Sequence, residues 1–124
     1  MSADENLATA KSAYAAFAAG DIEGASAPLA DDIEWIVPGN SAVSGVYRGK
    51  DEVLGFWGKL ASKGFTTQPE HLLADDERVV VLASTTADGQ QSDSADVLTF
   101  RDGKLVKFQT AVDTALQEKI WGTK

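Results

Sequence analysis

The stretch from Tyr14 to Trp57 decides the fold. It reads Y-A-A-F-A-A-G-D over residues 14–21, P-L-A-D-D-I-E-W-I-V-P-G over 28–39 and S-G-V-Y-R-G-K-D-E-V-L-G-F-W over 44–57. A first helix stops at Gly20, a short second helix precedes an acidic pair, and an apolar strand over 33–37 breaks at Pro38. A third helix opens after Gly49. This order of elements predicts one wall of a conical pocket.

The residues before this stretch supply the start of the first helix. Ser2 and Glu5 form an S-x-x-E capping box, a common signal for a helix N-terminus. Apolar residues then recur at helical spacing, and Asp21 can cap the second helix. Pro28 lies too far along that helix for a first-turn proline, so we expect the helix to kink or stop early there.

The residues after Trp57 change in character. The third helix starts near Asp51 and ends before Gly64. Four strands then follow, separated by turns that carry Asp-Asp or Asp-Gly pairs. The predicted strands are Thr66–Ala74, Arg78–Ala87, Ser92–Arg101 and Lys104–Asp113. Helices followed by an antiparallel meander indicate an α+β fold, in which a curved sheet wraps its own helices.

Composition narrows the possible functions. The 124 residues suit a single domain over 1–124, with a C-terminal tail from about residue 115. The chain has no cysteine, which excludes thiol chemistry, and a net charge of −8, which argues against nucleic-acid binding. No signal peptide or membrane span is indicated, so we expect a cytoplasmic protein. A lone histidine, His71, gives little scope for a metal site, and we expect neither metal nor cofactor.

The ordered motifs A-A-G-D, L-A-D-D, V-P-G, Y-R-G-K-D-E-V and F-R-D-G-K-L-V resemble the ketosteroid-isomerase-like superfamily. This superfamily includes SnoaL-like polyketide cyclases, limonene epoxide hydrolases and nuclear transport factor two. The resemblance covers roughly residues 5 to 115. It implies a cone-shaped α+β barrel with three N-terminal helices against a strongly curved, mostly antiparallel sheet. It also implies a homodimer formed through the sheet and an apolar small-molecule ligand in the cone.

The resemblance points first to Asp96, in S-A-D-V-L-T-F. Its position matches the residue that supplies the oxyanion-stabilising carboxylic acid in ketosteroid isomerases. Strand alternation places Asp96 on one face with Leu98 and Phe100. If that face is the inner one, an apolar environment would prepare the carboxyl for acid–base or oxyanion chemistry. The alternative is that Asp96 faces solvent while Val97 and Thr99 are buried.

Two other positions depart from the isomerase pattern. The carboxylate base of that enzyme matches Val37, which cannot accept a proton. Its phenol on the first helix is nearest to Tyr14, which is one residue out of place. Because one helical residue corresponds to a rotation of about 100°, we expect the Tyr14 hydroxyl to turn toward the core wall. The ketosteroid isomerase mechanism is therefore not expected.

Asp113 and His71 are the remaining catalytic candidates. Asp113 resembles the pocket aspartate of the cyclases and epoxide hydrolases. Strict alternation from Val106 and Phe108 turns it outward, and a bulge near Thr110 would restore it; otherwise it caps the C-terminal tail. An inward Asp113 would form a carboxylate pair with Asp96. His71 is either a structural hydrogen-bonding residue or, if inward, the acid or base of a cyclase-like site.

The epoxide hydrolases of this superfamily need an Asp-Arg-Asp relay that positions a water molecule. This chain lacks the arginine of that relay, so the epoxide hydrolase mechanism is not expected. Ser94 lies two residues before Asp96, and Arg48 and Arg101 lie in predicted turns. Aromatic residues are the expected lining of the pocket, with Tyr47 as a lid in its loop. The predicted substrate-binding residues are Tyr14, Trp35, Tyr47, Phe56, Trp57 and Leu98.

Two functions follow as hypotheses. The first is a small cofactor-independent enzyme of the isomerase, cyclase or hydrolase type, which uses Asp96, Asp113 and His71 on an apolar carbonyl compound. The second is a non-catalytic ligand-binding or dimerisation module of the same fold. A partner-binding adaptor is a third hypothesis. It is weaker because it would need an exposed apolar patch on the outer face of the sheet, and the sequence does not clearly supply one.

Overall fold

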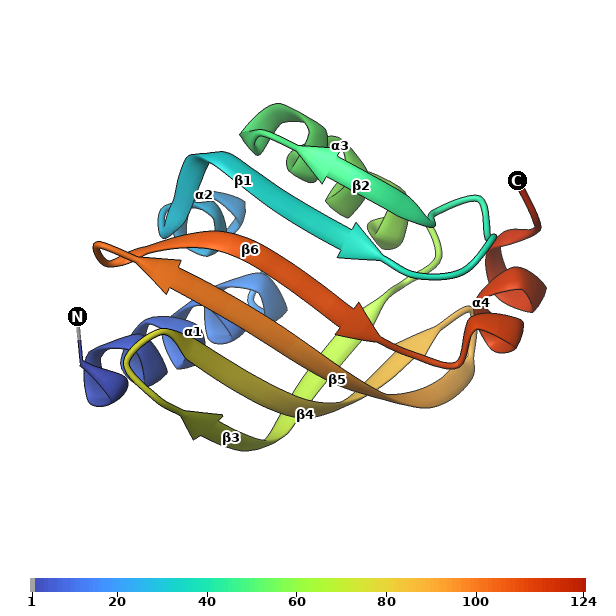
Figure 1. Ribbon diagram of the computed structural model, residues 1–124. Helices are drawn as coiled ribbons and strands as arrows, with labels where there is room; N and C mark the ends of the chain where they lie inside the picture. The colour runs from blue at the N-terminus through green and yellow to red at the C-terminus, as the bar shows by residue number, and fades with distance from the viewer. Residues whose placement is uncertain (1) are drawn as a thin grey trace.

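The computed structural model describes residues 2–124, which form one six-stranded sheet bent around its helices (Figure 1). The strand order is β2-β1-β6-β5-β4-β3. The β1–β6 pair is parallel and the other pairs are antiparallel. The helices are α1 (Ala3–Ala18), α2 (Ile22–Ser26), α3 (Lys50–Ala61) and α4 (Thr114–Trp121). The strands are β1 (Leu29–Val37), β2 (Gly45–Arg48), β3 (Thr66–Ala74), β4 (Arg78–Ala87), β5 (Gln90–Arg101) and β6 (Lys104–Ala111).

The layers explain where the core lies. In Figure 1 the sheet faces the viewer, α1 to α3 lie behind it, and α4 lies at one end. Buried apolar side chains from the helices meet the inner face of the sheet in one cluster, which includes Ala10, Val53, Val79, Val81 and Leu98. The α+β class, with N-terminal helices on a curved, mostly antiparallel sheet, is confirmed. Among residues 2–124, no helix is both long and apolar enough to cross a membrane.

Local sequence signals account for the helix starts and the hairpins. The Ser2–Glu5 capping box is present: each side chain accepts a hydrogen bond from the backbone N–H of the other residue, at 3.1 and 3.2 Å. The Asp-Gly pairs at 88–89 and 102–103 have positive φ at both residues (52° and 73°, 51° and 79°). Positive φ at both central residues suits two-residue hairpins, because it matches the right-handed twist of the strands.

The structure adds two elements that the sequence did not predict. β2 pairs with β1 alone, at the edge of the sheet, and its four residues were expected to form a loop. α4 occupies the region expected to be a tail. Asp113 precedes it and accepts a hydrogen bond from the Leu116 N–H at 3.1 Å, while Ile120 is buried. As expected from Pro28, α2 stops early, at Ser26.

Candidate functional site

A cavity of about 120 Å³ lies between the inner face of the sheet and the helices. Its lining is mostly apolar and aromatic, with one carboxyl group and a few hydroxyl groups. The aromatic residues in the lining are Tyr14, Phe17, Trp35, Phe56, Trp57, Phe65 and Phe108. Ligand sites in proteins have this composition: an apolar surface with a few polar groups that fix the orientation of the ligand.

The aromatic side of the cavity is held by ring contacts between β1, β6 and the helices. Trp35 stacks on Phe108 with ring centroids 3.7 Å apart and planes 10° from parallel. Trp57 meets Trp35 edge to face at 5.6 Å and Phe17 edge to face at 5.3 Å. Such contacts fix each ring against its neighbours, so this wall presents a preformed apolar surface.

The carboxyl group in the lining belongs to Asp96, which is only 4% exposed. Its Oδ2 accepts a hydrogen bond from the Tyr14 hydroxyl at 2.6 Å. Its Oδ1 accepts one from Thr110 Oγ1 at 2.7 Å, because Thr110 is the cross-strand partner of Asp96 on β6. Asp96 therefore lies inward on the face shared with Leu98 and Phe100, as alternation predicted.

Burial sets the protonation behaviour of this carboxyl. Loss of solvation raises the pKa of Asp96 above the ordinary aspartate value of 3.8, and the hydroxyls of Tyr14, Thr110 and Ser94 oppose that rise only in part. Burial, followed by the nearby Asp96 charge, also raises the pKa of the Tyr14 phenol. Tyr14 therefore stays protonated, and Asp96 holds a proton more tightly than a solvated aspartate does.

The expectation for Tyr14 was wrong. The one-residue displacement was expected to turn its hydroxyl toward the core wall, yet this hydroxyl reaches Asp96 and lines the cavity. Tyr14 lies one helical turn after Ala10, and both are buried on the face of α1 that packs on the sheet. The spacing from Gly20 gave the wrong direction for the Tyr14 side chain, whereas the pattern of buried residues along α1 gives the right one.

Asp113 does not join Asp96. It is exposed, and its carboxylate caps α4. The bulge that would have turned it inward lies at Val106, between Leu105 and Lys107, instead of near Thr110. Leu105 and Phe108 thus both face the core, and no Asp96/Asp113 pair exists.

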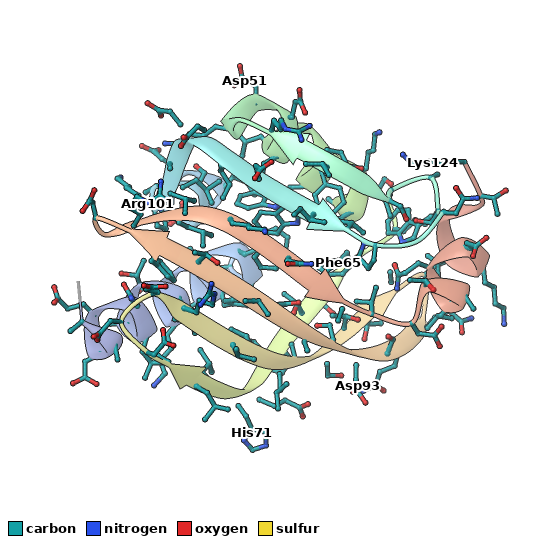
Figure 2. The ribbon with its side chains drawn as sticks, viewed as in Figure 1. Asp51, Phe65, His71, Asp93, Arg101 and Lys124 are labelled. Carbon is teal, nitrogen blue, oxygen red and sulfur yellow. The ribbon has the colours of Figure 1, made fainter. Side chains whose placement is uncertain are left out.

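His71 also lies outside the cavity. It is exposed on β3, and Figure 2 shows its ring pointing away from the molecule. A bulge between Pro69 and His71 adds one residue to β3, so His71 pairs with Leu82 on the outer face of β4. Thr67, before the bulge, faces inward opposite Thr85. The bulge shifts the alternation by one residue, which removes His71 from the site.

Five of the six predicted binding residues, Tyr14, Trp35, Phe56, Trp57 and Leu98, line the cavity. Tyr47 does not. It lies in β2, stacks on Phe56 at 4.5 Å and donates a hydrogen bond from its hydroxyl to the Val43 carbonyl oxygen at 2.7 Å. It supports the aromatic wall from behind instead of forming a lid.

Four hydroxyl residues in the lining, Thr67, Thr85, Ser94 and Thr110, were not among the predicted site residues. Ser94 could have been found from Asp96 by alternation, whereas Thr67 and Thr110 require the strand register. Among the lining residues, all within 2–124, only Tyr14 and Asp96 carry ionisable side chains. Within residues 2–124 there is no cluster of three or more His, Asp or Glu side chains that could hold a metal ion.

Comparison with known proteins places this architecture in a family. The chain is 28% identical to the uncharacterized protein Rv0034 of Mycobacterium tuberculosis, over 98% of this chain and 99% of that one. It shares a TM-score of 0.82 and 29% identity with an NTF2-like protein of Burkholderia xenovorans, over 98% of each chain. TerC, co-crystallized with polyporic acid, has a TM-score of 0.83 and 23% identity, over 96% of this chain and 99% of that one. Residues 10–108 match the SnoaL-like domain, and the chain therefore belongs to the SnoaL-like family.

Proposed function

We propose that this protein is a cofactor-independent enzyme of the isomerase or cyclase type, and that it moves a proton on a small apolar carbonyl compound held in the cavity. The observation that carries the proposal is the buried Asp96 carboxyl, hydrogen-bonded by Tyr14 and Thr110 in the wall of an apolar cavity. TerC, which shares the fold, was co-crystallized with polyporic acid, and this supports a small organic ligand.

The chemistry follows from the raised pKa of Asp96. A raised pKa makes the ionised carboxyl a stronger base toward a ligand C–H than a solvated aspartate is. Ionised Asp96 takes the proton from a carbon next to the ligand's carbonyl, and the C–H electron pair forms the enolate. The hydrogen bond from Tyr14 to Asp96 weakens once that carboxyl is protonated, so the phenol can donate to the enolate oxygen. In a ligand that carries a C=C bond next to that carbon, the electron pair spreads over a dienolate, and return of the proton from Asp96 to the far carbon of the dienolate moves the double bond and completes an isomerisation.

Solvent-proton exchange tests this step without knowledge of the natural substrate. Wild-type protein is mixed with cyclohexanone in D₂O, and loss of the α-hydrogen signal is followed by proton NMR. We expect acceleration over buffer, and we expect Asp96→Asn to reduce it by about 10²- to 10⁴-fold, the usual contribution of one acid–base group. Asp93→Asn is the matched control, because Asp93 lies exposed on the same strand. Equal exchange in wild type and Asp96→Asn would disprove the role of Asp96.

A second function, a ligand-binding module without chemistry, is favoured by one observation. Val37 lines the cavity at the position where the resemblance implies a carboxylate base, and Asp113 and His71 lie elsewhere. This function predicts that cyclohexanone binds, seen as ligand-induced chemical-shift changes in the protein, while its α-hydrogens exchange no faster than in buffer.

A further inference from the structure

Hydroxyl groups line one wall of the cavity, opposite the aromatic rings. Thr67 on β3, Thr85 on β4 and Ser94 on β5 all contribute to the lining, and we call these three residues the hydroxyl strip. Thr67 is the cross-strand partner of Thr85. Ser94 and Asp96 are successive inward residues of β5, so the strip continues directly to the buried carboxyl.

Two hydroxyls of the strip have no hydrogen-bond partner among residues 2–124. Thr67 Oγ1 and Ser94 Oγ are buried, and neither makes a hydrogen bond to any group in residues 2–124. The Ser94 hydroxyl lies near enough to Asp96 to favour its charged form, yet it completes no hydrogen bond of good geometry. Thr85 Oγ1 makes only a long bond, 3.4 Å, to the Ser92 carbonyl oxygen.

No hydrogen bond within residues 2–124 gives the Thr67 and Ser94 hydroxyls a role in holding the fold. A buried polar group without a partner loses its hydrogen bonds to water and gains nothing in return. The neighbouring inward positions of β4 hold Val79, Val81 and Ala83, all of them buried, so this face of the sheet packs apolar side chains readily. Because unpartnered buried hydroxyls are uncommon in native proteins, their presence inside a ligand-sized cavity points to a ligand.

The size and charge of the cavity restrict that ligand. An apolar cavity of about 150 Å³ holds benzene, so a cavity of about 120 Å³ has room for no more than about one small ring. No lining residue among those described carries a cationic side chain, and the chain has a net charge of −8. An anionic ligand would therefore find no counter-charge here and would be repelled weakly overall.

We infer that the cavity binds a neutral, oxygenated single-ring compound, with the ring face against Trp35, Trp57 and Phe108 and the ring's oxygen substituents hydrogen-bonded to Thr67 and Ser94. The inference rests on the proposed function in one respect, that this cavity is the ligand site. It deepens that function by naming the substrate class: a cyclic ketone that also carries a hydroxyl group, in its keto or enol form, and not a plain hydrocarbon.

The test compares two probes of similar size, resorcinol and toluene, by NMR titration. Wild-type protein should bind resorcinol more tightly. Thr67→Val keeps the shape of the side chain and Ser94→Ala removes one oxygen. Each should weaken resorcinol binding about two- to tenfold, as expected for one net hydrogen bond, and leave toluene binding unchanged or tighter. Thr86→Val, the next residue of β4 after Thr85 and on its other face, should alter neither probe.

Thermal unfolding of the ligand-free variants supplies the second measurement. If the strip serves a ligand, Thr67→Val should leave the melting temperature unchanged or raise it, since it removes an unpartnered buried hydroxyl. Equal wild-type affinity for the two probes would overturn the inference. So would lowered melting temperatures in Thr67→Val and Ser94→Ala with resorcinol affinity unchanged, because the hydroxyls would then be structural. Proton exchange in Asp96→Asn is a separate measurement. The proton-transfer role of Asp96 and the ligand class inferred from Thr67 and Ser94 can therefore fail independently of each other.

Discussion

At the scale of single residues, Asp96 decides what the cavity can do. Folding buries its carboxyl and raises its pKa above 3.8, so the folded state binds more protons than the unfolded state does between those two pKa values. The free energy of unfolding therefore falls as pH rises from about the unfolded-state pKa of Asp96 to its raised folded-state pKa. Above the folded-state pKa, the whole cost of ionising the buried carboxyl is subtracted from stability.

The first prediction concerns this pH dependence. Asp96→Asn removes the cost of ionising a buried carboxyl, so the variant should lose less stability than wild type as pH rises from about 4 to 8. Urea denaturation at a series of pH values measures the difference. Asp93→Asn, at an exposed site on the same strand, controls for the change in net charge. Parallel curves for wild type and Asp96→Asn would show that Asp96 does not titrate as we infer.

The second prediction concerns Tyr14. Its hydroxyl donates to Asp96 Oδ2 and lowers the pKa of that carboxyl. Tyr14→Phe should therefore raise the pKa of Asp96 further and move the rise of proton exchange with pH to higher pH. It should also cost about 0.5–1.5 kcal/mol of stability, the net value of one hydrogen bond. Carboxyl carbon NMR of Asp96 measures the pKa directly. A pKa that is unchanged or lowered in the variant would contradict this account.

At the scale of helices and strands, periodicity predicted much of the fold, and irregularities account for the errors. The bounds of Thr66–Ala74 and Arg78–Ala87 agree with the sequence prediction residue for residue, because Asp-rich turns mark their ends. The register within the strands was not predictable. The bulges at Pro69/His71 and at Val106 each shift the alternation of inward and outward side chains by one residue. Nothing in the sequence pattern around them predicted these bulges. These shifts decided which site candidates face inward.

The unpredictable strand register also limited what the sequence could predict about the candidate site. Asp96 was found because it lies on an unbroken run of alternation with Leu98 and Phe100. The sequence left the orientation of His71 open, because its direction depends on a bulge that the sequence does not reveal. The hydrogen-bond partners of Asp96 are Tyr14 on α1 and Thr110 on β6, 82 and 14 residues away in the chain, and only tertiary packing brings them to this carboxyl.

The third prediction concerns α4. Asp113 caps this helix through the Leu116 N–H, so Asp113→Ala should cost about 1 kcal/mol, measured by urea denaturation. Asp113→Ser should keep most of that stability, because serine is also a good N-cap. Proton exchange by the folded protein should persist in both variants, since the Asp113 carboxyl lies outside the cavity. A variant of Asp113 that is as stable as wild type but has lost proton exchange would show that Asp113 takes part in proton transfer.

At the scale of the whole molecule, no helix within residues 2–124 covers the outer face of the sheet (Figure 1), and this face carries an apolar band. Cross-strand pairing joins Leu73 to Val80 and Val80 to Val97, and it joins Leu82 to Ala95. Leu73 is 66% exposed and Leu82 is 41% exposed. Polar and charged residues border the band on both sides: Arg78, Thr99 and Lys107 form one row, and Gln68, Ser84 and Asp93 form the other.

The fourth prediction is that a second copy of this chain covers the band. An exposed apolar surface bordered by polar residues is typical of a protein interface, and a band that crosses the sheet can pair with itself about a two-fold axis. Leu73→Glu and Leu82→Glu should each convert a dimer to a monomer, measured by light scattering after size exclusion. Ile22→Glu is the control, since Ile22 is also exposed, at 45%, but lies on α2.

Salt gives the same prediction an independent measurement. Each copy carries a net charge of −8, so two copies repel each other, and added salt screens that repulsion. Leu73, Val80, Leu82, Ala95 and Val97, which form the band, carry no charge, so salt weakens no ion pair among them. Dimerisation through the band should therefore strengthen from low to moderate ionic strength, whereas an interface built on opposite charges would weaken. A wild-type protein that stays monomeric at both ionic strengths would show that the band serves some other purpose.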